Sequence, residues 1–177
     1  MEYQFSKSAV YVGTYGKYND GSIEGKWLCL SDYSDKADFY KACRELHRDE
    51  SDPEFMFQDW EYIPDKMIGE CFISGYWWDI YHACEGDEDK ITLLVDYLEN
   101  YICSFNLKGR DIRQLLEEAE DHSYCKVEEW DDYVHDRANN YMAQFPGFDS
   151  NLFDFDKYKD SLEYDVVWGS YYCFSPY

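Results

Sequence analysis

The amino-acid sequence predicts an α+β protein assembled from three small modules, and three observations carry this prediction. Runs of β-branched and aromatic residues between turn residues come first and indicate a sheet. Apolar residues then recur at helical spacing, and after residue 122 the two patterns mix. We therefore expect a β-sheet plus helix domain over residues 1–64, a helical domain over 65–121 and an α+β domain over 122–177.

The first module is expected to contain a hairpin, a helix and a third strand. Residues 10–15 and 27–30 are rich in strand-forming side chains, and Gly21 between them can take the positive φ of a turn. Ser34 is expected to cap a helix whose apolar residues fall at i, i+4 and i+7. These residues are Phe39, Cys43 and Leu46, and residues 55–57 follow as a short strand.

Three helices are expected in the middle module and two more in the last. Apolar residues at helical spacing cover 73–84, 91–102 and 112–119, with glycine breaks at 86 and 109. The same pattern covers 130–142 and 155–162. Residues 166–168 and 171–174 are then typical of two strands joined around Gly169.

The charge of the chain argues against a nucleic-acid partner. Its 177 residues hold 16 Lys and Arg against 38 Asp and Glu, which gives a net charge of −22. Binding DNA phosphates requires cationic side chains, so basic proteins are the expected partners. A disordered acidic chain is excluded because aromatic residues make up 20% of the sequence, enough for a packed core.

No motif predicts catalysis, a cofactor or a metal. The seven cysteines are odd in number and include no CxxC pair, so we expect reduced thiols. Asp87 opens an acidic run, but Thr92 and Leu98 stand where a calcium loop needs Gly and Glu. A glycosidase carboxylate pair stays an open alternative, because 38 acids supply one by chance. Without a leader-like or membrane-spanning segment, we expect a cytoplasmic protein that binds no membrane.

The acidic residues are distributed along the whole chain instead of forming a tail. The net charge is −6 over residues 1–64, −9 over 65–121 and −7 over 122–177. Many acids have i, i+3 or i+4 spacing on expected helix faces away from the apolar residues, among them Asp96 with Glu99 and Glu128 with Asp132 and Asp136. Like charges at this spacing reduce stability. B-DNA carries one charge per roughly 1.7 Å, so 22 charges correspond to about 11 base pairs.

We expect the partner-binding surface to lie on the acids of the second and third modules, although each could simply keep the protein soluble. These candidates are Asp87, Glu88, Asp89, Asp96, Glu99, Asp111, Glu117, Glu118, Glu120, Asp121, Glu128, Glu129, Asp132 and Asp136.

Several segments resemble the ArdA antirestriction proteins. YVGTYGKYNDGS at residues 11–22, GKWL at 25–28 and DPEFMFQDWE at 52–61 are similar to that family's first domain. EWDDYVHD at 129–136 and FDFDKYKDSL at 153–162 are similar to its C-terminal domain. The resemblance implies an elongated, three-domain, non-enzymatic mimic of bent B-form DNA that is carried by mobile elements. Such a protein occupies the DNA groove of type I restriction-modification enzymes, on their methyltransferase core.

The resemblance also implies a homodimer formed by the C-terminal domain. The candidate interface residues are Tyr124, Val127, Trp130 and Tyr133, which could equally fill the core of their own module. The alternative function is that of an acidic binding module for another basic DNA-binding protein.

Overall fold

The computed structural model describes residues 3–177 and confirms the α+β prediction. The chain forms two compact units. Among the described residues, the first comprises 3–92 and 105–113, and the second comprises 93–104 and 114–177. The expected helical segment 65–121 therefore contributes to both units. Periodicity identifies helices, but the grouping of helices depends on which apolar faces meet.

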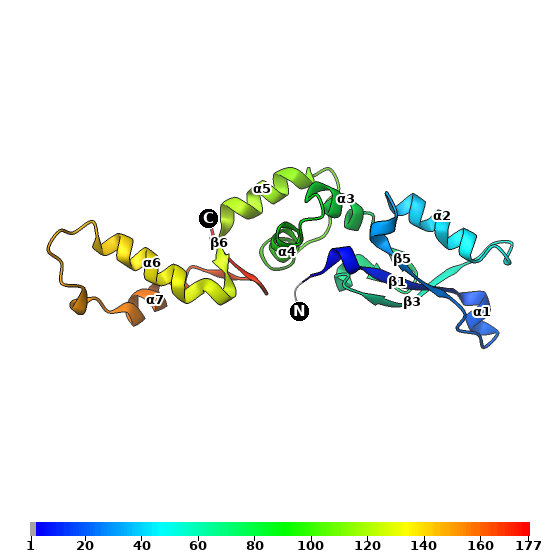
Figure 1. Ribbon diagram of the computed structural model, residues 1–177, viewed down its shortest axis with the longest axis horizontal. Coiled ribbons are helices and arrows are strands. Elements are labelled where there is room, and N and C mark those ends of the chain that lie inside the picture. Colours follow the sequence, from blue (N-terminus) through cyan, green and yellow to red (C-terminus); the bar gives the residue numbers. More distant parts are fainter. Residues whose placement is uncertain (1–2) are drawn as a thin grey trace. The chain divides into compact units, whose positions relative to one another are not determined.

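The first unit contains the expected three-stranded antiparallel sheet (Figure 1). Strand β1 (Ala9–Thr14) lies at its centre, between β2 (Lys26–Cys29) and β3 (Phe55–Glu61). A five-residue helix, α1 (Tyr15–Asn19), precedes the turn at Gly21, whose φ is 81°. A register shift between β1 and β3 falls after Tyr11 and leaves an extra residue in β3.

Helix α2 (Lys36–Leu46) covers one face of this sheet (Figure 1). Its Phe39 packs on Phe57 of β3, with ring centroids 5.9 Å apart. The predicted cap was wrong by one residue: the side chain of Asp35, not that of Ser34, accepts a hydrogen bond from Asp38 N. Asp35 satisfies a free N–H group of the first turn, and its charge favours the positive end of the helix dipole.

A short hairpin and one helix add to the core of the first unit. Strands β4 (Ile68–Gly69) and β5 (Phe72–Ile73) pair before α3 (Tyr76–Ala83). Ile73 therefore belongs to a strand and not to the helix that its spacing predicted. The Trp77 ring stacks on Phe5 at 5.4 Å, and Trp78 Nε1 donates to the carbonyl of Leu30.

The division between the two units falls within two helices, α4 (Glu88–Asp96) and α5 (Ile112–His122). Helix α4 continues directly into a π-helical turn, Tyr97–Tyr101, and α5 follows a loop. The π turn was not predicted, because an extra residue in one turn leaves little trace in a pattern of period 3.6. Short 3₁₀ turns occur at Phe5–Lys7, Leu30–Asp32, Asp65–Met67, Val127–Glu129 and Ser150–Leu152.

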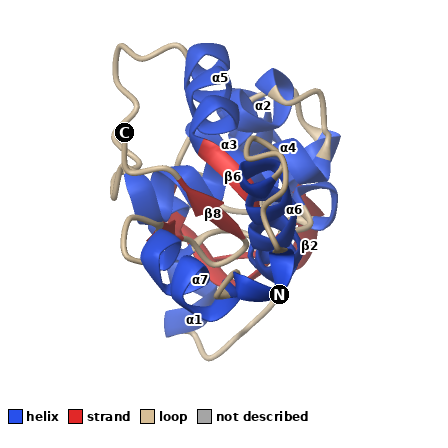
Figure 2. Cartoon of the chain, turned by 90° about the vertical axis from the view of Figure 1, so that its left-hand side faces the viewer, coloured by secondary structure: helices blue, strands red, loops and turns tan. Residues whose placement is uncertain are grey.

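The second unit contains a small antiparallel sheet and two further helices. Strand β8 (Tyr172–Phe174) lies between β6 (Ser123–Lys126) and β7 (Val167–Trp168). Figure 2 shows β6 beside β8. The hairpin of β7 and β8 was predicted, whereas β6 was missed. Helices α6 (Trp130–Met142) and α7 (Phe155–Glu163) confirm the two predicted helices.

Two apolar clusters hold the second unit together. The first joins the π turn to α5 and β8 through Tyr97, Ala119 and Phe174. The second packs Trp130 and Val134 of α6 against Cys173 of β8. Because both clusters use β8, the last strand of the chain links the two groups of helices.

Candidate protein-binding surfaces

Helix α5 presents a row of carboxylates on the face opposite its apolar residues. Leu115, Leu116 and Ala119 are buried. The candidates Glu117, Glu118, Glu120 and Asp121 are all exposed. Their i, i+3 and i+4 spacing places neighbouring carboxylates about 6 Å apart along the helix. This is the densest group of predicted acids on a single helix.

Helix α6 and the turn before it carry a second group. Asp132 and Asp136 are exposed on α6, and Glu128 and Glu129 are exposed in the preceding 3₁₀ turn. The predicted register of Glu128 with Asp132 assumed one continuous α-helix. It was wrong, because the α-helix begins only at Trp130. A 3₁₀ turn has a different angular step, so Glu128 is displaced from the line of the other two.

Most cationic side chains of the second unit form ion pairs or hydrogen bonds with groups other than the predicted surface acids. Lys159 pairs with Asp131, and Lys157 pairs with Asp154. Hydrogen bonding and the charge of Lys159 lower the pKa of Asp131. Arg137 donates to the Tyr133 hydroxyl at 2.7 Å. Within residues 3–177, no ion pair neutralises Glu117, Glu120, Asp121, Glu128, Asp132 or Asp136.

Three acids of the first unit also accept hydrogen bonds from backbone N–H groups, and those of Glu88 join segments more than 80 residues apart. Asp87 accepts hydrogen bonds from Asp89 N and Lys90 N at the start of α4. Glu88 is half-buried and accepts from two N–H groups of the N-terminal 3₁₀ turn, at 2.8 Å each. Asp111 accepts from Arg113 N at 2.9 Å. Asp87, Asp89 and Asp111 are exposed nonetheless, so their charges face solvent.

Asp96 is not part of the acidic surface. The prediction placed it beside Glu99 on a solvated helix face, but Asp96 is fully buried and Glu99 is half-buried. The Asp96 carboxylate accepts hydrogen bonds from the backbone N–H groups of Ser170, Tyr171 and Tyr172 at 2.7, 3.0 and 2.8 Å. The Asn100 amide donates to it as well, at 2.8 Å. A buried carboxylate with this many donors anchors the β7–β8 loop.

The four candidate interface residues lie together around the start of α6. Tyr124 and Tyr133 stack at 5.4 Å, and Trp130 stacks on Tyr133 at 5.5 Å. Trp130 is 5% exposed and belongs to the core of the unit. Tyr124, Val127 and Tyr133 are half-buried, and this side of the cluster is the part that a second copy could cover.

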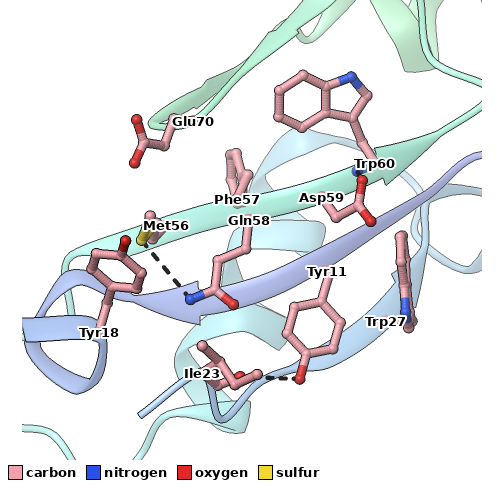
Figure 3. A pocket seen from close by; sticks show the side chains of 10 residues that line it. All are labelled: Tyr11, Tyr18, Ile23, Trp27, Met56, Phe57, Gln58, Asp59, Trp60 and Glu70. Carbon is pink, nitrogen blue, oxygen red and sulfur yellow. Dashed lines mark hydrogen bonds between the residues drawn. The ribbon is translucent and has the colours of Figure 1, made fainter. Parts of the chain in front are cut away.

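An open groove on the sheet of the first unit was missed by sequence reasoning (Figure 3). It encloses about 610 Å³. We call it the sheet groove. Side chains of α1, the β1–β2 loop and all three strands line it, together with Glu70. The lining residues are Tyr11, Tyr18, Ile23, Trp27, Met56, Phe57, Gln58, Asp59, Trp60 and Glu70.

The strand register explains why these side chains meet. Tyr11 pairs with Trp27 on one side and with Asp59 on the other, so the three form one row across the sheet. Val10 and Val12 are fully buried, and Val12 pairs with Phe57, which packs on Phe39 of α2. Alternation then places Tyr11 on the opposite face. A sequence signal existed, because Tyr11 and Trp27 add aromatic side chains to strands that already supply apolar residues to the core, and an exposed apolar patch marks an interaction site.

Two other features, a metal site and a membrane-spanning helix, have no candidate among the residues that the structure describes. No group of three or more His, Cys, Asp or Glu side chains in residues 3–177 could hold a metal ion. No helix within the same range is long and apolar enough to cross a membrane.

The comparison with protein families gives the identity of this acidic, two-unit chain. The model of the family described as "Antirestriction protein (ArdA)" matches residues 10–171. No curated protein and no solved structure matches the chain. The matched range covers nearly all 177 residues and includes both the sheet groove and the acidic helices. The chain therefore belongs to the ArdA family of antirestriction proteins.

Proposed function

We propose that this protein inhibits type I restriction-modification enzymes by occupying the DNA-binding groove of their methyltransferase core as a mimic of B-form DNA. Family membership implies an antirestriction function directed at restriction-modification enzymes. The observation that carries the finer proposal is a set of exposed carboxylates on α5 and α6 that form no ion pair within residues 3–177, namely Glu117, Glu120, Asp121, Asp132 and Asp136.

Fixed carboxylates can replace DNA phosphates at lower cost than a flexible acidic tail. The acids of α5 are held by a helix whose apolar residues are buried, so little conformational entropy is lost on binding. A basic groove releases its counterions when it meets them, as it does with DNA. The like-charge repulsion within the row lowers the stability of the free protein, and a cationic partner relieves it.

Dimerisation would extend the charged surface. Two copies of a −22 chain carry the charge of about 22 base pairs of duplex DNA. The half-buried side of the cluster at Tyr124, Val127 and Tyr133 supports this arrangement, because covering it requires no unfolding. The proposed place of action is the cytoplasm, where restriction enzymes meet incoming DNA.

The test compares two variants that remove the same charge from different surfaces. Glu117→Gln/Glu120→Gln/Asp121→Asn neutralises the α5 row. Asp20→Asn/Glu24→Gln/Asp52→Asn removes three exposed acids of the first unit. We expect the α5 variant to weaken inhibition of a type I enzyme at least about tenfold and the control to weaken it less than about threefold, while single changes cost little.

Two further measurements separate mimicry from general acidity. Excess duplex DNA should relieve inhibition, and affinity should fall as salt rises from 0.1 to 1 M, where the Debye length shrinks from about 10 to about 3 Å. Equal losses in both triple variants, or inhibition that DNA does not relieve, would refute the proposal. Either result would favour the alternative function, an acidic binding module for another basic DNA-binding protein.

A further inference from the structure

We propose that the sheet groove binds an arginine-bearing segment of a basic protein. The groove lies on the face of the first sheet that α2 leaves open, and its lining combines aromatic rings with carboxylates (Figure 3). Identifying the target restriction-modification enzyme as the source of this segment rests on the proposed function. The proposal that the groove binds arginine rests on the lining residues alone and does not depend on that function.

Aromatic faces form the floor of the groove. Trp27 and Tyr11 contact each other edge to face, with ring centroids 5.6 Å apart. Trp27 is 39% exposed and Tyr18 is 51% exposed, so both rings are accessible to a ligand. A planar guanidinium stacks on such rings and gains a cation–π attraction that an ammonium group matches less well.

Carboxylates stand at the border of the aromatic floor. Asp59 continues the row of Trp27 and Tyr11 across the strands, and Glu70 lines the same groove. Both are exposed. Asp59 uses its Oδ1 to accept from Trp60 N, which orients the carboxylate. The lining contains no Lys or Arg, so a cationic ligand meets no competing charge in the groove.

The groove is already formed in the free chain. The Tyr11 hydroxyl donates to the carbonyl of Ile23 at 3.2 Å, which holds the β1–β2 loop against the ring. A Cβ atom at Gly25 would collide with the Val12 carbonyl, so glycine is required for this close approach. Gln58 lies over Gly13, where a Cβ atom would be 2.8 Å from its amide nitrogen. Little ordering is therefore needed when a ligand binds.

Charge and size select the occupant. A volume of about 610 Å³ accommodates several side chains of an extended segment. A net charge of −22 repels nucleic acid and acidic peptides and attracts basic ones. A neutral sugar would use the aromatic floor but would gain nothing from the field around Asp59 and Glu70. Arginine uses both features at once, through stacking and through a two-pronged hydrogen bond to a carboxylate.

The experiment titrates a fluorescein-labelled peptide of alternating Gly and Arg, ten residues long, with the full chain at 0.15 M salt. The matching Gly-Lys peptide serves as the comparison. We expect the Arg peptide to bind at least about threefold tighter. Trp27→Leu and Asp59→Asn should each weaken its binding about three- to tenfold, whereas Trp27→Phe should retain most of it.

Matched controls separate the groove from the general charge. Tyr164→Leu removes a ring that is 90% exposed in the second unit, and Asp52→Asn removes an exposed charge outside the groove. Both should leave affinity within about twofold. If Trp27→Leu fails to fold by circular dichroism, Tyr18→Leu in α1 provides the same test.

Three outcomes would overturn the inference. Losses equal to those of the controls would show that only net charge matters. Equal affinity for the two peptides would show that the groove does not distinguish a guanidinium from an ammonium group. Displacement of the Arg peptide by cellohexaose would assign the groove to carbohydrate. Inhibition of a type I enzyme by the parent protein is measured separately. If the protein inhibits the enzyme but the groove variants bind the Arg peptide as the parent does, this inference alone is refuted. If the groove binds the Arg peptide as expected but the protein does not inhibit the enzyme, only the proposed function is refuted.

Discussion

Gly169 lies directly against the buried carboxylate of Asp96. A Cβ atom at position 169 would collide with both oxygens of this carboxylate, and the next three backbone N–H groups all donate to it. Residues more than 70 positions apart in the sequence are thereby joined. The absence of a side chain at Gly169 lets the β7–β8 loop wrap closely around a charge that would otherwise be costly to bury.

Gly169→Ala should destabilise the protein by about 2 kcal/mol, because the added methyl group displaces the Asp96 carboxylate from its donors. Urea unfolding followed by circular dichroism measures this. Gly75→Ala is the matched control, since its Cβ atom would make only ordinary contacts, the nearest at 3.8 Å from Lys36. A control that costs as much as Gly169→Ala would contradict this account of the loop.

Asp96→Asn should cost about 2 to 3 kcal/mol of folding free energy, since hydrogen bonds to a charged acceptor are lost in a buried site. Asp136→Asn removes an exposed charge from the middle of α6 and should leave stability unchanged or slightly higher, because like-charge repulsion falls. The unfolding free energies of both variants are compared with the parent. If the Asp96→Asn variant is as stable as the parent but inhibits a type I enzyme less well, Asp96 belongs to the partner-binding surface after all.

The stability of the first unit should fall at alkaline pH through Cys43. Burial raises the pKa of this thiol from 9.0 to about 12. The unfolded chain then loses the proton near pH 9 while the folded chain keeps it, so rising pH favours unfolding. At pH 10 this one thiol should lower the unfolding free energy by about 1.4 kcal/mol relative to pH 8.

Urea unfolding at pH 8 and pH 10 measures the effect. Cys43→Ala removes the thiol and should reduce the drop between the two pH values, whatever its own cost in packing. Cys29→Ala removes an exposed thiol and should leave the drop as it is in the parent. An identical drop in all three proteins would show that Cys43 does not cause it.

Sedimentation at micromolar concentration should show a dimer, with twice the chain mass of 21.3 kDa. Val127→Asp places a charge on the half-buried side of the proposed interface and should give the monomer, because an unpaired charge is costly to bury between two copies. Leu152→Asp is the control, since Leu152 is 77% exposed and lies outside the four candidates. Dissociation by Leu152→Asp alone would place the interface elsewhere.

The sequence alone determined the elements whose signal is local. Runs of β-branched and aromatic residues predicted β1, β2 and β3, and apolar spacing predicted α2 and every longer helix after it. The acidic excess and the ArdA-like segments determined the family, because composition and short motifs need no tertiary contact. Exposure of the α5 acids followed from the position of Leu115, Leu116 and Ala119 on the other face.

Only the tertiary structure decided which acids are available and where aromatic rings gather. Asp96 has the same local spacing as the surface acids, and its burial depends on a loop near the other end of the chain. The sheet groove depends on a register that joins residues 11, 27 and 59, and β6 forms because β8 pairs with it. Contacts between distant residues leave no periodic trace in a single sequence, whereas the helical and strand patterns do.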